Sequence, residues 1–385
     1  MKIVYYEMRK SWLKISTFIV LVILTVLNFI QADGTCGTYY NKTYGKRGEA
    51  YFTLYNTVCG EITEEKIAPF RERANWLNNE VSDMVFSSEY RPDLYYTGYI
   101  FGDFNLYNVD IAPEISYAVT YPNISDKIAS NAAECFHFYK SVGNDYEAEK
   151  YAMAYEMYQD RQIPEYRATY WTNLFFNHEL SSLLCIIMLI LGLANSFTNE
   201  RESGMYQIII SSGKSKTTTL AKIASAAVYC LFLSVYFTAA DLATANIILG
   251  VDGLDMPLYS AKMFQNTPFS FSIAEAIMLW IAAKFFALFV VALTILFASK
   301  ISPNTIVSFV LSFGIALVLI FLTAVSKSIL NPFNIIVPTA LAEEFSVMNI
   351  FGHPVLTLWA AIIFAAVECA VLCVTNTFIG QKSRR

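Results

Sequence analysis

The stretch IAEAIMLWIAAKFFALFVVALTILFA, residues 273–298, is apolar along almost its whole length. Its only charged side chains are Glu275 and Lys284. A helix needs roughly 20 apolar residues to cross a hydrocarbon layer of about 30 Å, and this stretch is long enough. It therefore predicts a helix that crosses a membrane.

Composition places the whole chain in the same environment. Of the 385 residues, 55% are hydrophobic and only 15% are charged, and the mean hydropathy is +0.42, which is too apolar for an ordinary soluble protein. Five further runs are long enough to span: 15–31, 180–197, 220–249, 306–324 and 355–378. All six must be helical, because lipid offers no partner to unpaired backbone groups. We expect an all-α polytopic membrane protein with six transmembrane helices.

Short basic segments beside these spans set the expected orientation, because such segments stay on the cytoplasmic side. They precede the first span, join the second to the third and the fourth to the fifth, and end the chain: Lys2, Arg9, Lys10 and Lys14; Arg201, Lys214, Lys216 and Lys222; Lys300; Lys382, Arg384 and Arg385. This pattern predicts a multi-pass plasma membrane protein with both termini in the cytoplasm. The first span continues into FIQADGTCG without the small-x-small site of a secretory signal, so we interpret it as an uncleaved anchor.

That topology divides the chain into three parts: 1–31, 32–178 and 179–385. The middle part, hereafter the insert, is expected outside the cell and is long enough to form its own core. It holds 21 acidic and 12 basic residues, a net charge of about −9. Such acidity serves solubility in many exported domains, and it could also attract a cationic partner.

Two segments of the insert have apolar residues at helical spacing with charges between them, EEKIAPFRERANWLNNEVSDMVF at 64–86 and GNDYEAEKYAMAYEMYQDRQ at 143–162. This spacing predicts two amphipathic helices. The middle of the insert, 90–121, is rich in Tyr, Phe, Pro, Gly and Asp, which indicates short strands or structured loops. We expect its aromatic side chains in a core rather than on a ligand platform. The prediction is a mixed, mainly helical extracellular domain.

Cysteines and histidines support no metal centre or hydrolytic site. Four of the seven cysteines fall in predicted spans as apolar filler: Cys185, Cys230, Cys369 and Cys373. In the insert, Cys36 and Cys59 are a candidate disulfide that would leave Cys135 over; another pairing, free thiols and metal ligation stay open. No spacing resembles a zinc site, and the three histidines are scattered along the chain.

The sequence ISSGKSK, residues 210–216, looks like the end of a phosphate-binding loop. That loop requires a glycine five positions before the Gly of Gly-Lys-Ser, because backbone amides at both ends must surround the phosphates. The residue at that position is Ile208. We therefore interpret the segment as a basic cytoplasmic turn, and we expect no nucleotide site and no enzymatic activity in this chain itself.

Four ionisable residues lie inside the predicted spans: Asp241, Glu275, Lys284 and Glu368. Charges in lipid are costly and usually face a bundle interior or a water-filled path. Lys284 and Glu368 have similar predicted depths, so an ion pair between them is the simplest expectation. That pair could fix helix packing or take part in translocation. Asp241 and Glu275 are closer to the outer ends of their spans and could reach interfacial water.

The most specific region is the cytoplasmic link FTNERESGMYQIIISSGKSKTTTLAKIASA, residues 197–226. A charged ERESG step leads into a short amphipathic helix, a basic turn and then a span that begins with a Lys. This order resembles the element that docks on the ATPase in the type-2 permease family of ATP-binding cassette exporters. The resemblance implies a coupling helix at about 198–219, with Lys222 opening the next helix and with these ATPase-coupling residues: Glu200, Arg201, Glu202, Gly204, Met205, Tyr206 and Lys214.

Two more regions extend the resemblance over nearly the whole chain. The start MKIVYYEMRKSWLK is similar to the family's connecting helix, which lies along the membrane before the first span. The stretch NPFNIIVPTALAEEF, within about 327–352, is similar to the family's extracellular re-entrant hairpin, where Pro and Asn interrupt a short helical dip. The insert is much larger than in minimal members of the family, which leaves the substrate open.

The resemblance implies a permease subunit that binds no cofactor itself. ATP and Mg would be held by a separate soluble ATPase subunit, and a second permease chain, identical or related, would complete the path within the membrane lipid. No nucleic acid is expected. The acidic, aromatic-rich insert suits export of a cationic amphipathic peptide. Two other classes stay open: an ion-coupled secondary transporter that uses the intramembrane charges, and a membrane-anchored receptor.

Overall fold

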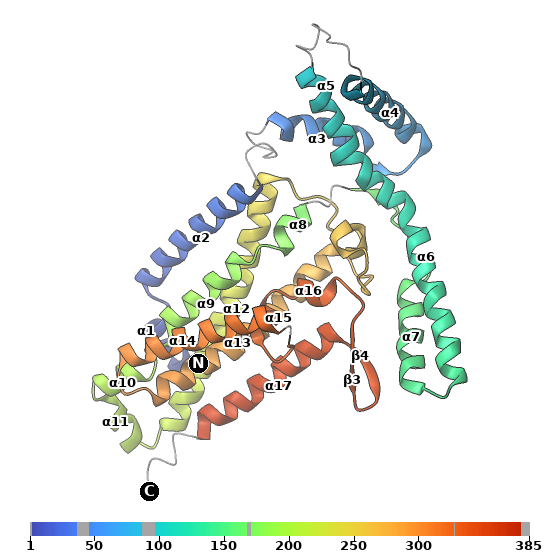
Figure 1. The fold of residues 1–385 in the computed structure, drawn as a ribbon. Coiled ribbons are helices and arrows are strands. Elements are labelled where there is room, and N and C mark those ends of the chain that lie inside the picture. The colour runs from blue at the N-terminus through green and yellow to red at the C-terminus, as the bar shows by residue number, and fades with distance from the viewer. Residues whose placement is uncertain (1, 37–45, 87–96, 168–170, 327, 379–385) are drawn as a thin grey trace.

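The computed structural model describes residues 2–36, 46–86, 97–167, 171–326 and 328–378 (Figure 1). Six of its helical stretches are long and apolar enough to cross a membrane, and each overlaps one of the predicted runs. They are α2 (Ile15–Cys36), α9 (Leu180–Leu193) with its flanking helices α8 (Trp171–Phe176) and α10 (Thr198–Glu202), α12 (Ser215–Ile248), α13 (Ile273–Ile301), α14 (Thr305–Val325) and α17 (Thr357–Phe378). The prediction of a largely helical, multi-pass membrane protein is confirmed.

Helix α13 is the centre of the bundle, because α9, α12, α14 and α17 all pack against it. Its Ala283 and Ala287 are fully buried. Small side chains of this kind let neighbouring helices approach closely, which is how helices associate where lipid removes the hydrophobic driving force. Helices α2 and α14 lie at the periphery, with most of their apolar side chains exposed.

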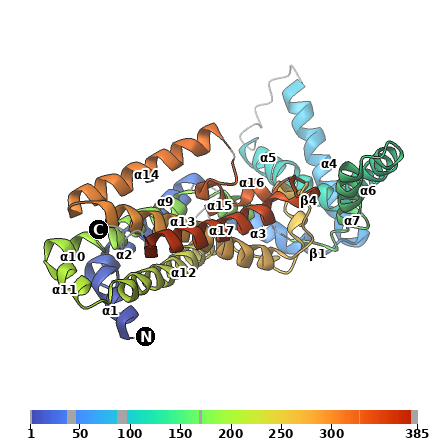
Figure 2. The same cartoon turned by 90° about the horizontal axis from the view of Figure 1, so that it is seen from below.

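The two ends of the bundle differ (Figures 1 and 2). Helices α1 (Lys2–Ser11), α10 and α11 (Met205–Ser211) lie at one end, which the last residues of α17 also reach. We call this the terminal end. There the ammonium group of Lys216 lies 5.7 Å from the ring centre of Phe378. Helices α3 to α7 of the insert lie at the opposite end, the insert end.

The described part of the insert is mainly helical. Its elements are α3 (Lys46–Val58), β1 (Gly60–Glu61), α4 (Glu64–Phe86), α5 (Thr97–Phe104), the π-helix η2 (Asn105–Ile111), α6 (Ala112–Ser141), α7 (Asp145–Tyr158) and β2 (Glu165–Tyr166). Strands β1 and β2 pair antiparallel, with Gly60 opposite Tyr166. The two amphipathic helices predicted from apolar spacing are confirmed as α4 and α7.

The prediction of strands or loops over 90–121 was wrong for its described residues, which are helical from residue 97 onward; 90–96 lie outside the described residues. Pro113 does not prevent this, because it lies at the junction of η2 and α6, in the first turn of α6, where proline is tolerated. Tyr117 and Tyr121 are one helical turn apart and both buried, and the Tyr121 ring stacks 5.0 Å from that of Tyr259. These aromatic side chains are in a core, as expected.

Between α14 and α17 the chain forms two short helices, α15 (Pro332–Ile336) and α16 (Thr339–Ala342), and then a hairpin of β3 (Val347–Ile350) and β4 (His353–Leu356). Helix α15 packs against α13, α14 and α17. The interrupted helices follow from the Pro and Asn residues of this stretch. This β-hairpin, unlike the interrupted helices before it, was not predicted. It contacts the insert, where His353 Nδ1 lies 3.1 Å from Glu149 Oε2 of α7.

One arginine fastens the insert to the bundle. Arg161, only 4% exposed, donates hydrogen bonds of 2.7 Å to the carbonyl oxygens of Thr267 and Pro268, in the link between η4 (Lys262–Phe264) and α13. Its guanidinium lies 4.5 Å from the Tyr158 ring and 4.8 Å from the Tyr259 ring. Tyr259 belongs to η3 (Leu258–Ser260), which precedes η4 in the link between α12 and α13. We call this arrangement the Arg161 clamp.

Candidate functional site

The link predicted to couple with an ATPase forms an elbow of two short helices at the terminal end. Helix α10 ends at Glu202, and α11 begins at Met205. Gly204 joins them at a φ of 72°, a left-handed conformation that suits glycine. No residue of α11 is buried, and its Ile208 side chain is 67% exposed. The elbow therefore presents α11 as a surface helix.

A buried group of four charges holds the elbow to the bundle. Lys222 of α12 lies 2.8 Å from Glu7 of α1 and 2.8 Å from Glu200 of α10, and it donates a 2.7 Å hydrogen bond to the Ser196 carbonyl oxygen. Lys10 of α1 lies 2.6 Å from Glu200. Glu7, Glu200 and Lys222 are 2 to 6% exposed. We call Glu7, Lys10, Glu200 and Lys222 the Lys222 network. The negative charges of its two carboxylates equal the positive charges of its two ammonium groups.

Arg201 and Glu202 fix the same elbow to the turn between α13 and α14. Arg201 donates to the carbonyl oxygens of Lys300 and Ser302 at the end of α13, where a cation complements the helix dipole. Glu202 accepts hydrogen bonds from the backbone NH (2.7 Å) and hydroxyl (2.9 Å) of Thr305, at the start of α14. A carboxylate at a helix N-terminus is favourable for the same reason.

The predicted coupling residues thus form two groups. Glu200 and Arg201, with Glu202, make internal contacts that position the elbow. Met205 and Lys214 are exposed and face solvent, with Tyr206 half-buried beneath the Arg201 guanidinium at 5.3 Å. The surface available to another protein is therefore α11 and the basic turn after it, rather than the ERE sequence itself.

The intramembrane charges are arranged differently from the prediction. No ion pair within the described chain joins Lys284 to Glu368. Lys284 instead lines a small cavity with Asp241, and the two charges interact electrostatically. Equal depth along two spans does not place two side chains on facing sides: Lys284 is turned toward α9 and α12, whereas Glu368 is half-buried on α17. The expected pair was wrong.

Glu275 has a local role at the first turn of α13. It accepts a 2.7 Å hydrogen bond from the Ser272 backbone NH, while its own NH donates to the Ser272 hydroxyl at 3.2 Å. This reciprocal capping box satisfies two backbone groups that the helix start leaves unpaired. The helix cap explains why a carboxylate occurs in this apolar run.

Asp241 is part of a polar cluster from three spans. Asn28 of α2 donates a 2.7 Å hydrogen bond to Asp241 Oδ1 of α12, and His178 Nε2, in the stretch before α9, lies 2.7 Å from Asn28 Oδ1. Asn28 is 1% exposed and Asp241 is 7% exposed. Sequence reasoning missed Asn28 and His178. The signal was present in Asn28, one of the two amides in the first apolar run, the other being Gln31 at its end.

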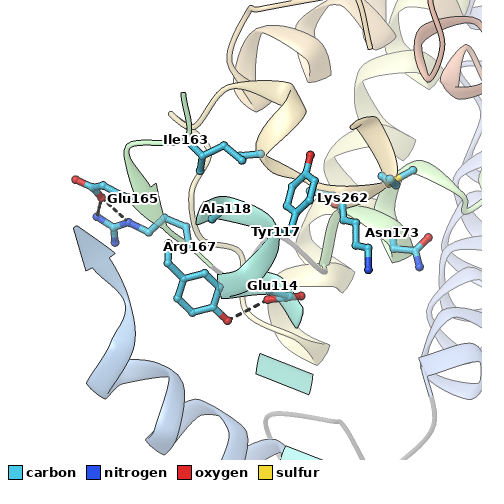
Figure 3. A pocket seen from close by; sticks show the side chains of 12 residues that line it. Glu114, Tyr117, Ala118, Ile163, Glu165, Arg167, Asn173 and Lys262 are labelled. Carbon is cyan, nitrogen blue, oxygen red and sulfur yellow. Dashed lines mark hydrogen bonds and ion pairs between the residues drawn. The ribbon is translucent and has the colours of Figure 1, made fainter. Parts of the chain in front are cut away.

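Two cavities lie where the insert meets the bundle. One of about 350 Å³ is lined by Glu114 and Tyr117 of α6, Glu165 and Arg167 near β2, and Lys262 (Figure 3). The Tyr166 hydroxyl donates a 3.0 Å hydrogen bond to Glu114, and burial raises the pKa of Glu114 to about 7. A second cavity of about 690 Å³ shares Glu114 and Asn173 with the first.

The second cavity also reaches the bundle, because His178, Leu180 and Leu249 line it. The remaining polar groups on its wall include Asp110 and Glu179. Its lining thus combines carboxylic acids with apolar side chains such as Val109, Leu180 and Leu249. A concave, partly apolar surface with a few polar groups is the usual form of a site for a small ligand.

The cysteine prediction stays open, because the Cys36 side chain lies outside the described residues. Cys59 Sγ lies 3.8 Å from the Asn56 carbonyl oxygen. Among the residues that the structure describes, no group of three or more His, Cys, Asp or Glu side chains could hold a metal ion. Cys185, Cys230 and Cys369 are buried in the bundle as apolar filler.

Comparisons with known proteins leave the family open: no family model, no curated protein and no solved structure matches this chain.

Proposed function

We propose that this chain is the transmembrane permease subunit of an ATP-binding cassette exporter. It couples ATP hydrolysis by a separate soluble ATPase, which holds ATP and Mg, to the outward movement of a substrate. The observation that carries the proposal is α11, a surface helix without a single buried residue, presented by an elbow that is firmly fixed to four helices of the bundle. The resemblance of the link to the type-2 permease family supports it.

The contacts of the elbow give a mechanical route. A force on α11 acts through α10, because Glu200 is bound to Lys222 of α12 and to Lys10 of α1. It also acts on the turn between α13 and α14 through Arg201 and Glu202. Movement of a docked ATPase would therefore displace several spans together. In this proposal the terminal end is cytoplasmic, the insert is extracellular, and a second permease chain, identical or related, completes the path in the plasma membrane.

Substitution of Ile208 by Glu tests the docking surface. The change places a carboxylate at the centre of the exposed face of α11 and disturbs no buried contact, because Ile208 is 67% exposed. We expect at least about a tenfold loss of a co-purifying P-loop ATPase, the effect of removing one apolar anchor from an interface. The measurement is mass spectrometry of what accompanies the full chain, solubilised in mild detergent from its native membrane.

Phe138→Glu is the matched control, because Phe138 is 60% exposed on α6 of the insert, at the other end of the molecule. It should retain the ATPase. Recovery of the wild-type chain without any ATPase, in repeated preparations, would refute the proposal. Equal recovery with Ile208→Glu and Phe138→Glu would remove α11 as the docking surface.

The polar cluster of Asn28, His178 and Asp241, with Lys284 beside it, favours a second candidate, an ion-coupled secondary transporter. Buried ionisable groups from several spans are typical of ion and proton pathways. Transport by the purified chain in liposomes, driven by an ion gradient without ATP, would support this candidate and count against the exporter.

A further inference from the structure

A small internal cavity lies at the insert end of the bundle, between α9, α12, α13 and α15. Its volume is about 20 Å³. The polar side chains on its wall belong to His178, Ser182, Thr238, Asp241 and Lys284, and apolar side chains such as those of Phe176 and Trp280 line the rest. A cavity needs roughly 10–15 Å³ to hold one water molecule, and that water needs two to four polar partners. This cavity meets both conditions.

Two hydroxyl groups on its wall lack a partner. Ser182 is 5% exposed and Thr238 is 4% exposed, and neither hydroxyl oxygen has a hydrogen-bond partner within the described part of the chain. A buried polar atom left in this way costs about 1–3 kcal/mol. Native structures rarely leave such groups unsatisfied, and here two of them line one cavity, which points to a small ligand that both can reach.

One of the two charges on the wall, the Lys284 ammonium, also lacks a direct partner among the described residues, whereas Asp241 accepts a hydrogen bond from Asn28. Lys284 is 7% exposed, and no hydrogen bond or ion pair of its ammonium group occurs among the described residues. Asp241 interacts with it electrostatically, but the pair is not within the 4 Å of a direct ion pair. An ammonium group carries three donors, and burying it without acceptors is costly.

We propose that this cavity binds one water molecule that bridges Lys284 to Asp241. The water accepts a hydrogen bond from the Lys284 ammonium and one from a hydroxyl, and it donates to Asp241 and to the other hydroxyl. Four partners match the hydrogen-bonding capacity of water. The unpartnered groups from α9, α12 and α13 are satisfied together, which no direct contact between them achieves.

The bound water also completes a polar chain through the bundle. His178 is linked to Asn28, Asn28 to Asp241, and Asp241 through the water to Lys284. His178 lines both this cavity and the 690 Å³ cavity under the insert. The water site is therefore the inner end of a polar connection that begins at the larger cavity. The inference does not depend on the exporter proposal.

The sign of a stability change tests the site. Thr238→Val keeps the shape of the side chain and removes the hydroxyl. If the water is bound, the variant loses a hydrogen bond and the apparent Tm of the full chain in nanodiscs falls by about 2 °C or more. If no water is bound, removal of an unsatisfied buried hydroxyl raises the Tm or leaves it unchanged.

Ser312→Ala is the matched control. The Ser312 hydroxyl on α14 is also buried and unpartnered among the described residues, and it does not line this cavity. Its removal should not lower the Tm. A fall for Thr238→Val and for Ser182→Ala, without a fall for Ser312→Ala, supports the water site; no fall in any of the three overturns it.

A second measurement uses the wild-type chain and needs no variant to fold. X-ray radiolysis in H₂¹⁸O activates bound water where it lies, so that neighbouring buried side chains become labelled. We expect label on Phe176, which is 2% exposed and lines the cavity, and none on Phe237, which is fully buried and does not. Equal absence of label on both residues overturns the proposal, and so does equal labelling.

Discussion

Lys222 shows how one side chain organises the terminal end. It sits between two buried carboxylates, Glu7 and Glu200, at 2.8 Å from each. A buried charge that loses its partner is strongly destabilising, because its desolvation is no longer compensated. The acidic residues predicted as docking contacts therefore stabilise the fold, and a charge reversal at Glu200 would unfold the terminal end instead of testing ATPase binding.

Lys222→Met should lower the free energy of unfolding by about 3–5 kcal/mol, because it leaves two buried carboxylates with one cation between them. Lys10→Met is the comparison, since the Lys10 side chain is 21% exposed and Glu200 keeps Lys222. That change should cost about 0–1 kcal/mol. Thermal unfolding of both variants in the same detergent measures the difference; equal losses would contradict a special role for Lys222.

At the scale of residues, the sequence predicted where charged side chains lie along the spans but not which groups they contact. Hydropathy placed Lys284 and Asp241 inside apolar runs, with Asp241 close to an outer end where it could reach interfacial water. Their partners could not be predicted, because partner choice depends on how each helix is rotated about its axis. The depth of a residue along its span gives no information on that rotation. Arg161 was missed because an arginine in an acidic insert carries no signal that distinguishes a buried clamp from a solvated side chain.

At the scale of elements, Gly192 determines how closely α9 approaches α12 and Trp12, the residue that follows α1. A Cβ at this position would lie 2.7 Å from a ring carbon of Tyr229 and 3.2 Å from Trp12. These two rings stack 4.6 Å apart, and the Trp12 indole NH donates a 3.2 Å hydrogen bond to Ser225. The glycine makes room for an aromatic pair that joins the N-terminal segment to the third span.

Gly192→Ala should destabilise the bundle by about 1–3 kcal/mol through overpacking. Gly314→Ala in α14 provides the contrast, because no atom lies within 4 Å of its added Cβ. There alanine should stabilise the helix by about 0.5–1 kcal/mol. Opposite shifts in apparent Tm would support this account of the packing, whereas a neutral Gly192→Ala would refute the close contact.

Elements with a clear period were the most predictable. The six spans are apolar runs long enough to cross a membrane, and a segment in lipid must be helical. Helices α4 and α7 have apolar residues at helical spacing. Helix α6 was missed because Pro113, Pro122 and its tyrosines resemble a loop, although the first proline lies in the opening turn and the tyrosines pack at helical spacing. Hairpin β3–β4 was missed because four-residue strands have no period of their own.

At the scale of the whole molecule, the Arg161 clamp joins two parts that the sequence separates. The insert begins after the first span, and the clamp fastens it to the link between the third and fourth spans. Motion of α12 and α13 would therefore be transmitted to the insert. The number of spans was predictable because lipid imposes helices; this connection was not, because it depends on a contact between residues 106 positions apart.

Arg161→Met should loosen the contact between the insert and the α12–α13 link. The variant loses hydrogen bonds to two carbonyl oxygens and the stacking on two tyrosine rings, and we expect a loss of about 3 kcal/mol locally. Hydrogen–deuterium exchange of the full chain should become faster in the segment 258–271. Arg71→Met is the control, because the ion pair of Arg71 within the described chain is an exposed one with Glu64. Unchanged exchange in both variants would show that the clamp is dispensable.

The Lys222 network also constrains the order in which the molecule can be completed. Glu7 and Lys222 are 215 positions apart, and Lys10 and Glu200 are 190 apart. Synthesis proceeds from the N-terminus, so α1 exists long before its partners. Lys10 lacks its partner until residue 200 has been made, and Glu7 lacks its own until residue 222 has been made. The contacts of the Lys222 network therefore form late, after the entire insert has been synthesised. A nascent chain that stops earlier has an N-terminal helix without its binding partners.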